Sequence, residues 1–160
     1  MTLYIMVGIP GSGKSTYAKK LAADTGAILV SRDSIRFSLV KENEYYFQQE
    51  TKVFDLYCHQ IADNLREGRD VIADATHLSI KSREKIISTL DEKCGMADTA
   101  YDIIFIVMKT DFQICLQRNE KRTGLSKVPQ SAIRRMSHQL QIPSIDEFEN
   151  IKEIRVITNG

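Results

Sequence analysis

GIPGSGKST, at residues 8–16, is the stretch that decides the fold of this 160-residue chain. It follows the apolar run LYIMV at residues 3–7 and precedes a segment in which Tyr17, Ala18 and Leu21 recur at helical spacing. The stretch satisfies the phosphate-binding pattern GxxxxGK(S/T), which is informative when it lies between a strand and a helix. The sequence therefore predicts a glycine-rich phosphate-binding loop, or P-loop, with a strand before it and a helix after it.

The residue types in this loop suit the binding of ATP and Mg²⁺. Glycines let successive backbone N–H groups turn inward onto phosphate, and the helix that follows adds its positive N-terminal end. In this pattern Lys14 reaches the β- and γ-phosphates and Ser15 binds Mg²⁺. ATP is favoured over GTP because the chain has no DxxG, and MKTD at residues 108–111 lacks the Asn of NKxD. The residues expected to hold the nucleotide are Gly11, Ser12, Gly13, Lys14, Ser15 and Thr16.

Asp33 follows the apolar run AILV at residues 27–30, and Arg36 comes three residues later in the segment SRDSIRF. Ligands of open α/β sheets bind at the carboxyl ends of the strands, which is where this pair is expected. A carboxylate there accepts the proton of an attacking hydroxyl, and a nearby arginine holds a phosphate bidentately. The pair predicts a pocket for the phosphate acceptor. The alternative is that Asp33 only caps a helix and Arg36 lies on the surface.

Asp74 ends the run DVIAD at residues 70–74. An acidic residue after a hydrophobic strand commonly holds Mg²⁺, directly or through water, so Ser15 and Asp74 form the predicted metal site. An ordinary strand-end aspartate is the alternative. Thr76 and His77 come next, and for His77 a neutral ring hydrogen-bonded to backbone is favoured over a role in proton transfer.

Residues 117–135 hold six of the chain's 22 Lys and Arg residues against a single Glu. Arg118 and Arg122 are four residues apart, so on one helix they would share a face and contact the same transferring phosphoryl group. TGLSKVP, at residues 123–129, interrupts the helix, and Pro129 is placed to start another. The segment predicts a mobile lid over ATP with these two arginines as catalytic residues. Exposed charges without a function are the alternative.

Apolar runs bounded by turn residues recur along the chain, with amphipathic stretches between them. Strands that are nearly continuous in apolar residues and alternate with helices indicate a parallel sheet covered on both faces. The predicted fold is therefore α/β, with three layers and five strands, and no repeat or internal boundary divides residues 1–160 into more than one domain. The strands are expected at residues 3–7, 27–30, 71–73, 103–108 and 154–157, and helices at residues 46–65, 79–93 and 111–122.

Four segments stand in this order: GIPGSGKST, SRDSIRF, DATHLS with Arg83 after it, and RNEKRTGLSKVPQSAIRRM. Together they resemble the phage polynucleotide kinase family. The kinase domain of that family has a P-loop, an RDxxR acceptor motif, a DATN-like third-strand motif, and an arginine lid followed by VP and a helix. The resemblance runs from residue 3 to residue 136, and NEYYFQQETKVF at residues 43–54 is similar to the family's second-helix region.

The resemblance implies a P-loop kinase fold with strand order 2-3-1-4-5 and an ATP-dependent kinase for the 5′-hydroxyl of DNA or RNA. By matching position it implies that Lys14 and Ser15 are the nucleotide and metal residues. It also implies that Asp33 is the general base and that Arg36 contacts the acceptor phosphate. Relatives with the same core also phosphorylate small molecules, so the resemblance defines the chemistry better than it defines the acceptor.

The predicted lid also matches the family, whereas two features of the chain depart from the family pattern. Arg122 matches the lid arginine that the family needs most, with Arg118 beside it. His77 stands where the family usually has Asn. The chain also ends after its fifth predicted strand, so a phosphatase domain like the one fused in the phage enzyme is not expected.

Composition excludes several classes of protein. The hydrophobic fraction of 42% and the charged fraction of 27% are ordinary globular values. Cys58, Cys94 and Cys115 have no CxxC or Cys/His spacing, so neither a disulfide framework nor a zinc site is indicated. No basic leader precedes the first apolar run, and no apolar run is long enough to span a membrane. A cytoplasmic protein without membrane partners is expected.

Two other functions stay open beside the polynucleotide kinase. The net charge of +1 favours a kinase for a small metabolite, nucleoside or antibiotic hydroxyl, since tight binders of polynucleotides are usually basic. A switch or partner-binding module that hydrolyses ATP slowly is disfavoured, because a base, a lysine and arginines all have candidates. No pattern in the chain specifies an oligomeric state.

Overall fold

Residues 1–41 and 49–159 are described by the computed structural model, in which helices alternate with the strands of one sheet. The strands are β1 (Thr2–Val7), β2 (Ile28–Ser31), β3 (Val71–Asp74), β4 (Asp102–Lys109) and β5 (Ile151–Thr158). The helices are α1 (Lys14–Thr25), α2 (Arg32–Leu39), α3 (Glu50–Arg66), α4 (Ile80–Glu92), α5 (Phe112–Glu120) and α6 (Gln130–Gln139), with the 3₁₀ turn η1 (Gly124–Ser126) before α6. Within the described ranges, no helix has the length and apolar character needed to cross a membrane.

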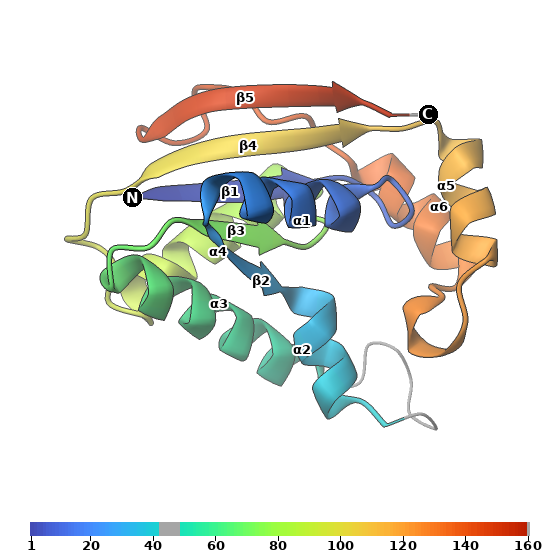
Figure 1. Cartoon of the computed structure of the whole chain (residues 1–160), viewed down its shortest axis with the longest axis horizontal. Coiled ribbons are helices and arrows are strands. Elements are labelled where there is room, and N and C mark those ends of the chain that lie inside the picture. The colour runs from blue at the N-terminus through green and yellow to red at the C-terminus, as the bar shows by residue number, and fades with distance from the viewer. Residues whose placement is uncertain (42–48, 160) are drawn as a thin grey trace.

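The five strands lie in the order β2-β3-β1-β4-β5, and every neighbouring pair is parallel. The α/β fold and the strand order expected from the sequence are therefore confirmed. All carboxyl ends of the strands lie at one edge, and α5 and α6 stand beside that edge (Figure 1). In a parallel sheet this edge is where ligands bind, so the loops after β1, β2 and β3 converge on the candidate site.

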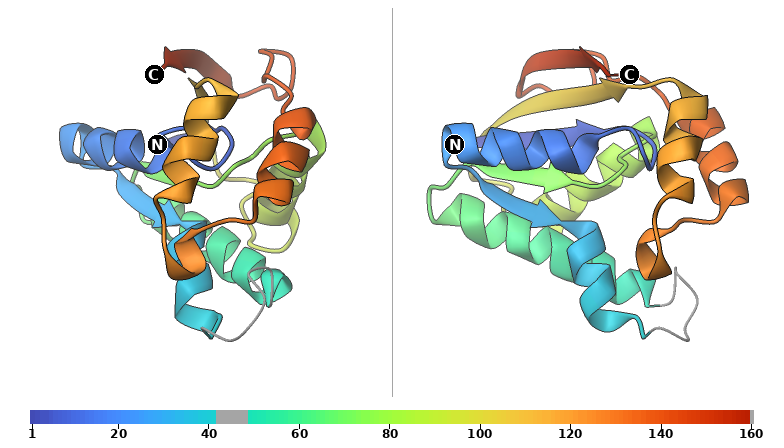
Figure 2. Two further views of the ribbon diagram at one scale, coloured as in Figure 1. Left: turned by 90° about the vertical axis from the view of Figure 1, so that its right-hand side faces the viewer. Right: turned by 45° about the vertical axis from the view of Figure 1, so that its right-hand side comes forward.

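Two layers of helices cover the sheet because its strands are apolar on both faces. Along β1, Leu3 and Ile5 belong to one core, which contains the apolar sides of α3 and α4, whereas Tyr4 and Met6 belong to the other. The second core is closed by Ala18 and other residues of α1. Figure 2 shows α1 on one side of the sheet and α3 and α4 on the other. This alternation of neighbouring residues between two faces is the period of a β-strand.

Most element boundaries lie within two residues of the sequence prediction. The last strand begins at Ile151, three residues before the predicted apolar run. The apolar run missed this start because β5 is an edge strand, on which the exposed Lys152 and Glu153 are tolerated. The ladder between β4 and β5 also shifts its register by one residue between Ile103 and Ile104, as a β-bulge does. The helix predicted at residues 46–65 is described from Glu50 onwards, and residues 43–48 of the family-like segment lie outside the described residues.

Candidate active site

The loop between β1 and α1 is shaped by two glycines with left-handed backbone angles. Gly11 has φ +84° and Gly13 has φ +94°, a region that L side chains rarely adopt. A Cβ atom would lie 2.5 Å from the carbonyl oxygen of Cys115 at Gly11, and 2.4 Å from Nδ2 of Asn159 at Gly13. The backbone angles and these close contacts therefore favour glycine at both positions.

Lys14 lies buried at the first residue of α1, where its Nζ donates a hydrogen bond of 2.9 Å to the carbonyl of Ile9. Burial lowers the pKa of this ammonium, and the carboxylates of Asp74 and Asp33 oppose that shift. Within the described residues, the buried hydroxyl of Ser12 has no hydrogen-bond partner. A buried cation and an unpartnered polar oxygen in a loop that only glycine can form fit the phosphates of a nucleotide.

The predicted metal residues meet at the end of β3. The hydroxyl of Ser15 donates to Oδ2 of Asp74 at 3.0 Å. Asp74 is buried, which raises the pKa of its carboxyl, while Lys14 and the hydrogen bond from Ser15 oppose the rise. A hydroxyl and a carboxylate oxygen at the phosphate loop are the ligand types that Mg²⁺ takes in nucleotide sites, so the two residues fit this metal.

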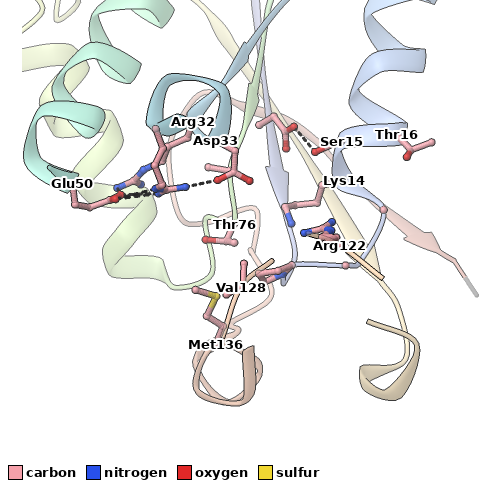
Figure 3. Close-up of a pocket in the computed structure, with 16 residues that line it drawn as sticks. Lys14, Ser15, Thr16, Arg32, Asp33, Glu50, Thr76, Arg122, Val128 and Met136 are labelled. Carbon is pink, nitrogen blue, oxygen red and sulfur yellow. Dashed lines mark hydrogen bonds and ion pairs between the residues drawn. The ribbon is translucent and has the colours of Figure 1, made fainter. Parts of the chain in front are cut away.

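The predicted acceptor pair lies opposite the loop, at the start of α2. Arg36 donates through Nη1 to the carboxylate of Asp33, and through Nη2 to Oε1 of Glu50 at 2.9 Å. Arg32 pairs with the same Glu50 carboxylate. The side chain of Arg36 is 7% exposed and that of Asp33 is 52% exposed, so the arginine is packed and the aspartate faces the opening. The clamp from α3 onto α2 thus orients Asp33 (Figure 3).

Glu50 and Arg32 are the residues of this group to which the sequence analysis assigned no role. Burial alone would raise the pKa of the Glu50 carboxyl, but hydrogen bonds and charges from Arg36 and Arg32 outweigh burial and lower it. Glu50 is therefore ionised and offsets the charges of both arginines. Glu50 lies in the segment at residues 43–54 that is similar to the family's second-helix region, but no motif within this segment marks Glu50 as a site residue.

The two lid arginines do not share a helical face, so that prediction is wrong. Helix α5 ends at Glu120, two residues before Arg122, because the chain turns at Lys121. Arg118 donates from Nη1 to the carbonyl of Gly11 at 3.2 Å, on the outer side of the loop, and from Nη2 to Asn159 at 3.4 Å. Arg122 instead lines the same cavity as Lys14, towards which it points (Figure 3).

The candidate residues surround one cavity of about 300 Å³ at the carboxyl edge of the sheet. Ser12 and Arg118 are predicted site residues that do not line it. Thr76, Val128 and Met136 line the cavity although the sequence analysis assigned them no role. The predicted residues that do line it are Gly11, Gly13, Lys14, Ser15, Thr16, Asp33, Arg36, Asp74 and Arg122.

His77 supports the loop after β3 and does not line this cavity. Its Nδ1–H donates to the carbonyl of Met6 at 2.6 Å, so Nε2 accepts from the hydroxyl of Tyr57 at 3.0 Å. Burial lowers the pKa of the ring to about 3. The prediction of a neutral histidine hydrogen-bonded to backbone is confirmed.

The site combines a strand, a glycine-rich loop and a helix with a serine–aspartate pair in the same cavity. This arrangement is that of a P-loop nucleotide-binding protein. The chain belongs to the AAA domain family, whose model matches residues 3–143. Some of the proteins that it matches are described as kinases. A P-loop with a serine–aspartate pair beside it is the arrangement that binds a nucleotide and Mg²⁺ in P-loop proteins.

Two relatives are similar over most of this chain. One is a protein of Autographa californica nuclear polyhedrosis virus described as a bifunctional polynucleotide kinase/RNA ligase, 30% identical over 135 residues, with 76% of this chain and 18% of that protein covered. The other is the 2′,3′-cyclic-nucleotide 3′-phosphodiesterase of Rattus norvegicus, 31% identical over 128 residues, with 75% and 27% covered. The chain thus spans less than a third of the length of either relative.

Solved structures share the fold. A chain of the Pnkp1/Rnl/Hen1 RNA repair complex matches with a TM-score of 0.71 and 29% identity, over 87% of this chain and 43% of that chain. A Chloroflexus aurantiacus protein described as a kinase matches with a TM-score of 0.76 and 15% identity, over 98% of this chain and 84% of that chain. A gluconokinase of Sinorhizobium meliloti matches with a TM-score of 0.60 and 16% identity, over 98% and 82%. The last two matches, at low identity, concern the fold alone.

Proposed function

We propose that this protein is an ATP-dependent kinase that transfers the γ-phosphoryl group to the 5′-hydroxyl of DNA or RNA, and that residues 1–160 act as one kinase domain. The observation that carries the proposal is that a carboxylate–arginine pair and a phosphate loop line the same cavity. Asp33 and Arg36 lie on one side of it, and Lys14 and Arg122 on the other. The candidate acceptor residues and the candidate phosphate loop therefore face the same space, as phosphoryl transfer between two bound substrates requires.

Each residue has a distinct task in this reaction. Asp33 accepts the proton of the acceptor hydroxyl, whose oxygen forms the new bond to the γ-phosphorus as the bond to the β–γ bridging oxygen breaks and ADP leaves. Arg36 orients Asp33 and binds the phosphate next to the hydroxyl. Lys14 and Arg122 stabilise the negative charge of the transferring group, since phosphoryl transfer depends on positioning and charge neutralisation.

The nucleotide and the metal would be held by the first turn of α1 and its loop. Backbone N–H groups of residues 11–16 would hold the phosphates, and Ser15 with Asp74 would hold Mg²⁺, which neutralises phosphate charge when bound. Arg118 lies outside the loop, against Gly11 and Asn159. We therefore assign Arg118 the task of positioning the loop that binds the nucleotide. We do not assign it a direct contact with the transferring phosphoryl group.

Two observations support a polynucleotide acceptor. The relatives of about 30% identity include a protein described as a polynucleotide kinase and a chain of an RNA repair complex. In addition, Asp33 and Arg36 lie side by side, so that a carboxylate that can accept a proton stands next to a guanidinium that can bind a phosphate. A nucleotide with a 5′-hydroxyl and a 3′-phosphate offers both complementary groups, whereas a simple sugar offers the hydroxyl alone.

A small-molecule kinase is the second candidate, and one feature of the cavity favours it. Glu50 already neutralises Arg36 and Arg32, and Asp33 and Asp74 add two further carboxylates to the lining. This reduces the positive potential that a polyanionic strand would meet. A neutral polyhydroxy acceptor would be less affected.

Transfer of labelled phosphate distinguishes the candidates. The purified protein is incubated with γ-labelled ATP, Mg²⁺ and either 5′-OH oligonucleotides or a panel of sugars, nucleosides and amino alcohols. The proposal expects labelled oligonucleotide, and the Lys14→Ala variant serves as the control for contaminating kinases. Labelling of a phosphate-free metabolite with no oligonucleotide product would replace the proposal with the small-molecule kinase.

A further inference from the structure

A second cavity opens beside the active-site cavity, and its volume is about 290 Å³. Arg32, Thr76 and Met136 line both cavities, so the two adjoin on the acceptor side of the site. The remaining walls come from α3, from the loop after β3 with the first turns of α4, and from α6. A molecule bound beside Asp33 could therefore extend into the second cavity without leaving the protein surface.

The lining of the second cavity carries positive charge only. Arg32, Lys85 and Arg135 contribute three cations, and none of the residues that line it is acidic. In the part of the chain that the structure describes, neither Lys85 nor Arg135 forms an ion pair. The active-site cavity differs, because Asp33, Glu50 and Asp74 lie among its cations. The second cavity is therefore the more attractive of the two to an anion.

An aromatic ring holds two of these cations at the cavity wall. Nζ of Lys85 lies 4.6 Å from the centre of the Phe54 ring, and Cζ of Arg32 lies 5.2 Å from it. Cation–π contacts of this kind position a cation without neutralising its charge. Nε of Arg32 also has no hydrogen-bond partner among the described residues. Because Arg32 is already paired with Glu50, the charge that remains available to an anion in the second cavity is that of Lys85 and Arg135.

We propose that the second cavity binds the next phosphate along a nucleic acid strand, with Lys85 and Arg135 as its contacts. This inference rests on the proposed function, in which Asp33 and Arg36 hold the terminal 5′-OH nucleotide and its own 3′-phosphate. A strand repeats one phosphate per nucleotide, so two adjoining anion sites match its chemistry. A small metabolite offers no second phosphate to this site.

Acceptor length tests the inference. The kcat/KM value is measured for a nucleoside 3′-monophosphate and for a dinucleotide that also ends in a 3′-phosphate. The second phosphate should raise kcat/KM by about two- to thirtyfold, the range expected from two exposed ion pairs. Lys85→Ala and Arg135→Ala should each lower the ratio of the two values, the double variant should bring it close to one, and Lys85→Arg should retain it.

The matched control is Lys93→Ala, which removes an exposed lysine at the opposite end of α4. It should leave the ratio at the wild-type value. Far-ultraviolet circular dichroism and a thermal melt confirm that each variant is folded. Affinity for a labelled 5′-OH oligonucleotide, measured by fluorescence anisotropy over a range of KCl concentrations, adds a readout without catalysis. Removing one phosphate-binding side chain should reduce the slope of log K against log salt by about 0.7.

The outcomes separate this inference from the proposed function. Equal kcat/KM values for the two acceptors, or a ratio that ignores both substitutions, would overturn the second site and leave the kinase intact. If no phosphate is transferred to nucleotides but the salt slope of oligonucleotide binding still falls in the double variant, the second phosphate site is supported and the polynucleotide kinase activity is refuted. Absence of both binding and transfer would refute both.

Discussion

At the residue scale, the position of Asp33 predicts a selective loss of catalysis. Its carboxylate is half-exposed towards the cavity and is oriented by Arg36. Asp33→Asn keeps the shape but cannot accept a proton, so kcat should fall by about 10² to 10⁴. Steady-state kinetics give kcat, and titration calorimetry gives the affinity for ATP, which should change little. Loss of ATP binding would instead place Asp33 in the nucleotide site.

His77 predicts a dependence of stability on pH. The pKa of the folded ring is about 3, below its ordinary value of 6.5, so the unfolded chain binds more protons between these values. The stabilising contribution is therefore complete above pH 6.5 and is lost as pH falls, at about 1.4 kcal/mol per pH unit. His77→Asn removes this titration, and Asn tolerates the positive φ of 45° better than most residues.

Urea unfolding at several pH values measures the effect. Between pH 6.5 and 4.5 the wild type should lose up to about 3 kcal/mol of unfolding free energy more than His77→Asn. His138→Asn, which changes an exposed histidine at the end of α6, is the control and should follow the wild type. Parallel pH profiles for wild type and His77→Asn would contradict the buried neutral ring.

At the element scale, one carboxylate of α3 links it to α2, in addition to the apolar core that the two helices share. Glu50 begins α3 and pairs with Arg32 and Arg36 of α2. Glu50→Gln and Arg36→Ala should therefore be coupled in unfolding free energy by about 0.5 to 3 kcal/mol, measured by a double-mutant cycle in urea. Glu50→Gln with Lys52→Ala, an exposed change two residues along α3, should be additive. A coupling near zero for Glu50 and Arg36 would contradict the clamp.

The elements that local patterns predicted are those whose signal is confined to a few neighbouring residues. The P-loop, the strands β1 and β4 and the break at residues 123–129 all follow from glycine, apolar runs or proline. The end of α5 was missed because nothing in RNEKR marks a helix end. The four-residue spacing of Arg118 and Arg122 predicts one helical face, whereas α5 ends at Glu120 and leaves Arg122 outside the helix.

At the scale of the whole molecule, the features that the sequence could not predict are contacts between distant segments. The strand order came from a resemblance, because apolar runs alone do not specify which strands pair. The sequence does not reveal Glu50 because its role comes from an ion pair with Arg36, which is 14 positions away, and no sequence motif connects the two residues. Asn159 likewise reaches the P-loop carbonyl of Ser12 across 147 positions.

Arg83 shows what such a contact does for the whole fold. The side chain is fully buried in α4 and pairs with Glu147 before β5, with Nε 2.6 Å from Oε1. It also donates to the carbonyls of His77 at 2.7 Å and Gln141 at 2.9 Å. One cation thus joins α4, the loop after β3 and the segment that leads to β5. Removing it would leave a buried carboxylate and two backbone carbonyls without their donor.

We therefore expect Arg83→Ala to lower the unfolding free energy by about 3 to 5 kcal/mol, the usual cost of leaving a buried ion unpaired. The double change Arg83→Met with Glu147→Leu removes both charges and keeps much of the volume. If the ion pair alone mattered, this variant would recover the wild-type stability. Because the two carbonyls still lack donors, it should stay about 1 to 3 kcal/mol below the wild type. Urea unfolding measures both, with Arg69→Met, at an exposed ion pair with Glu67, as the control that should change little. Full recovery in the double variant would show that the charges, and not the backbone contacts, make Arg83 necessary.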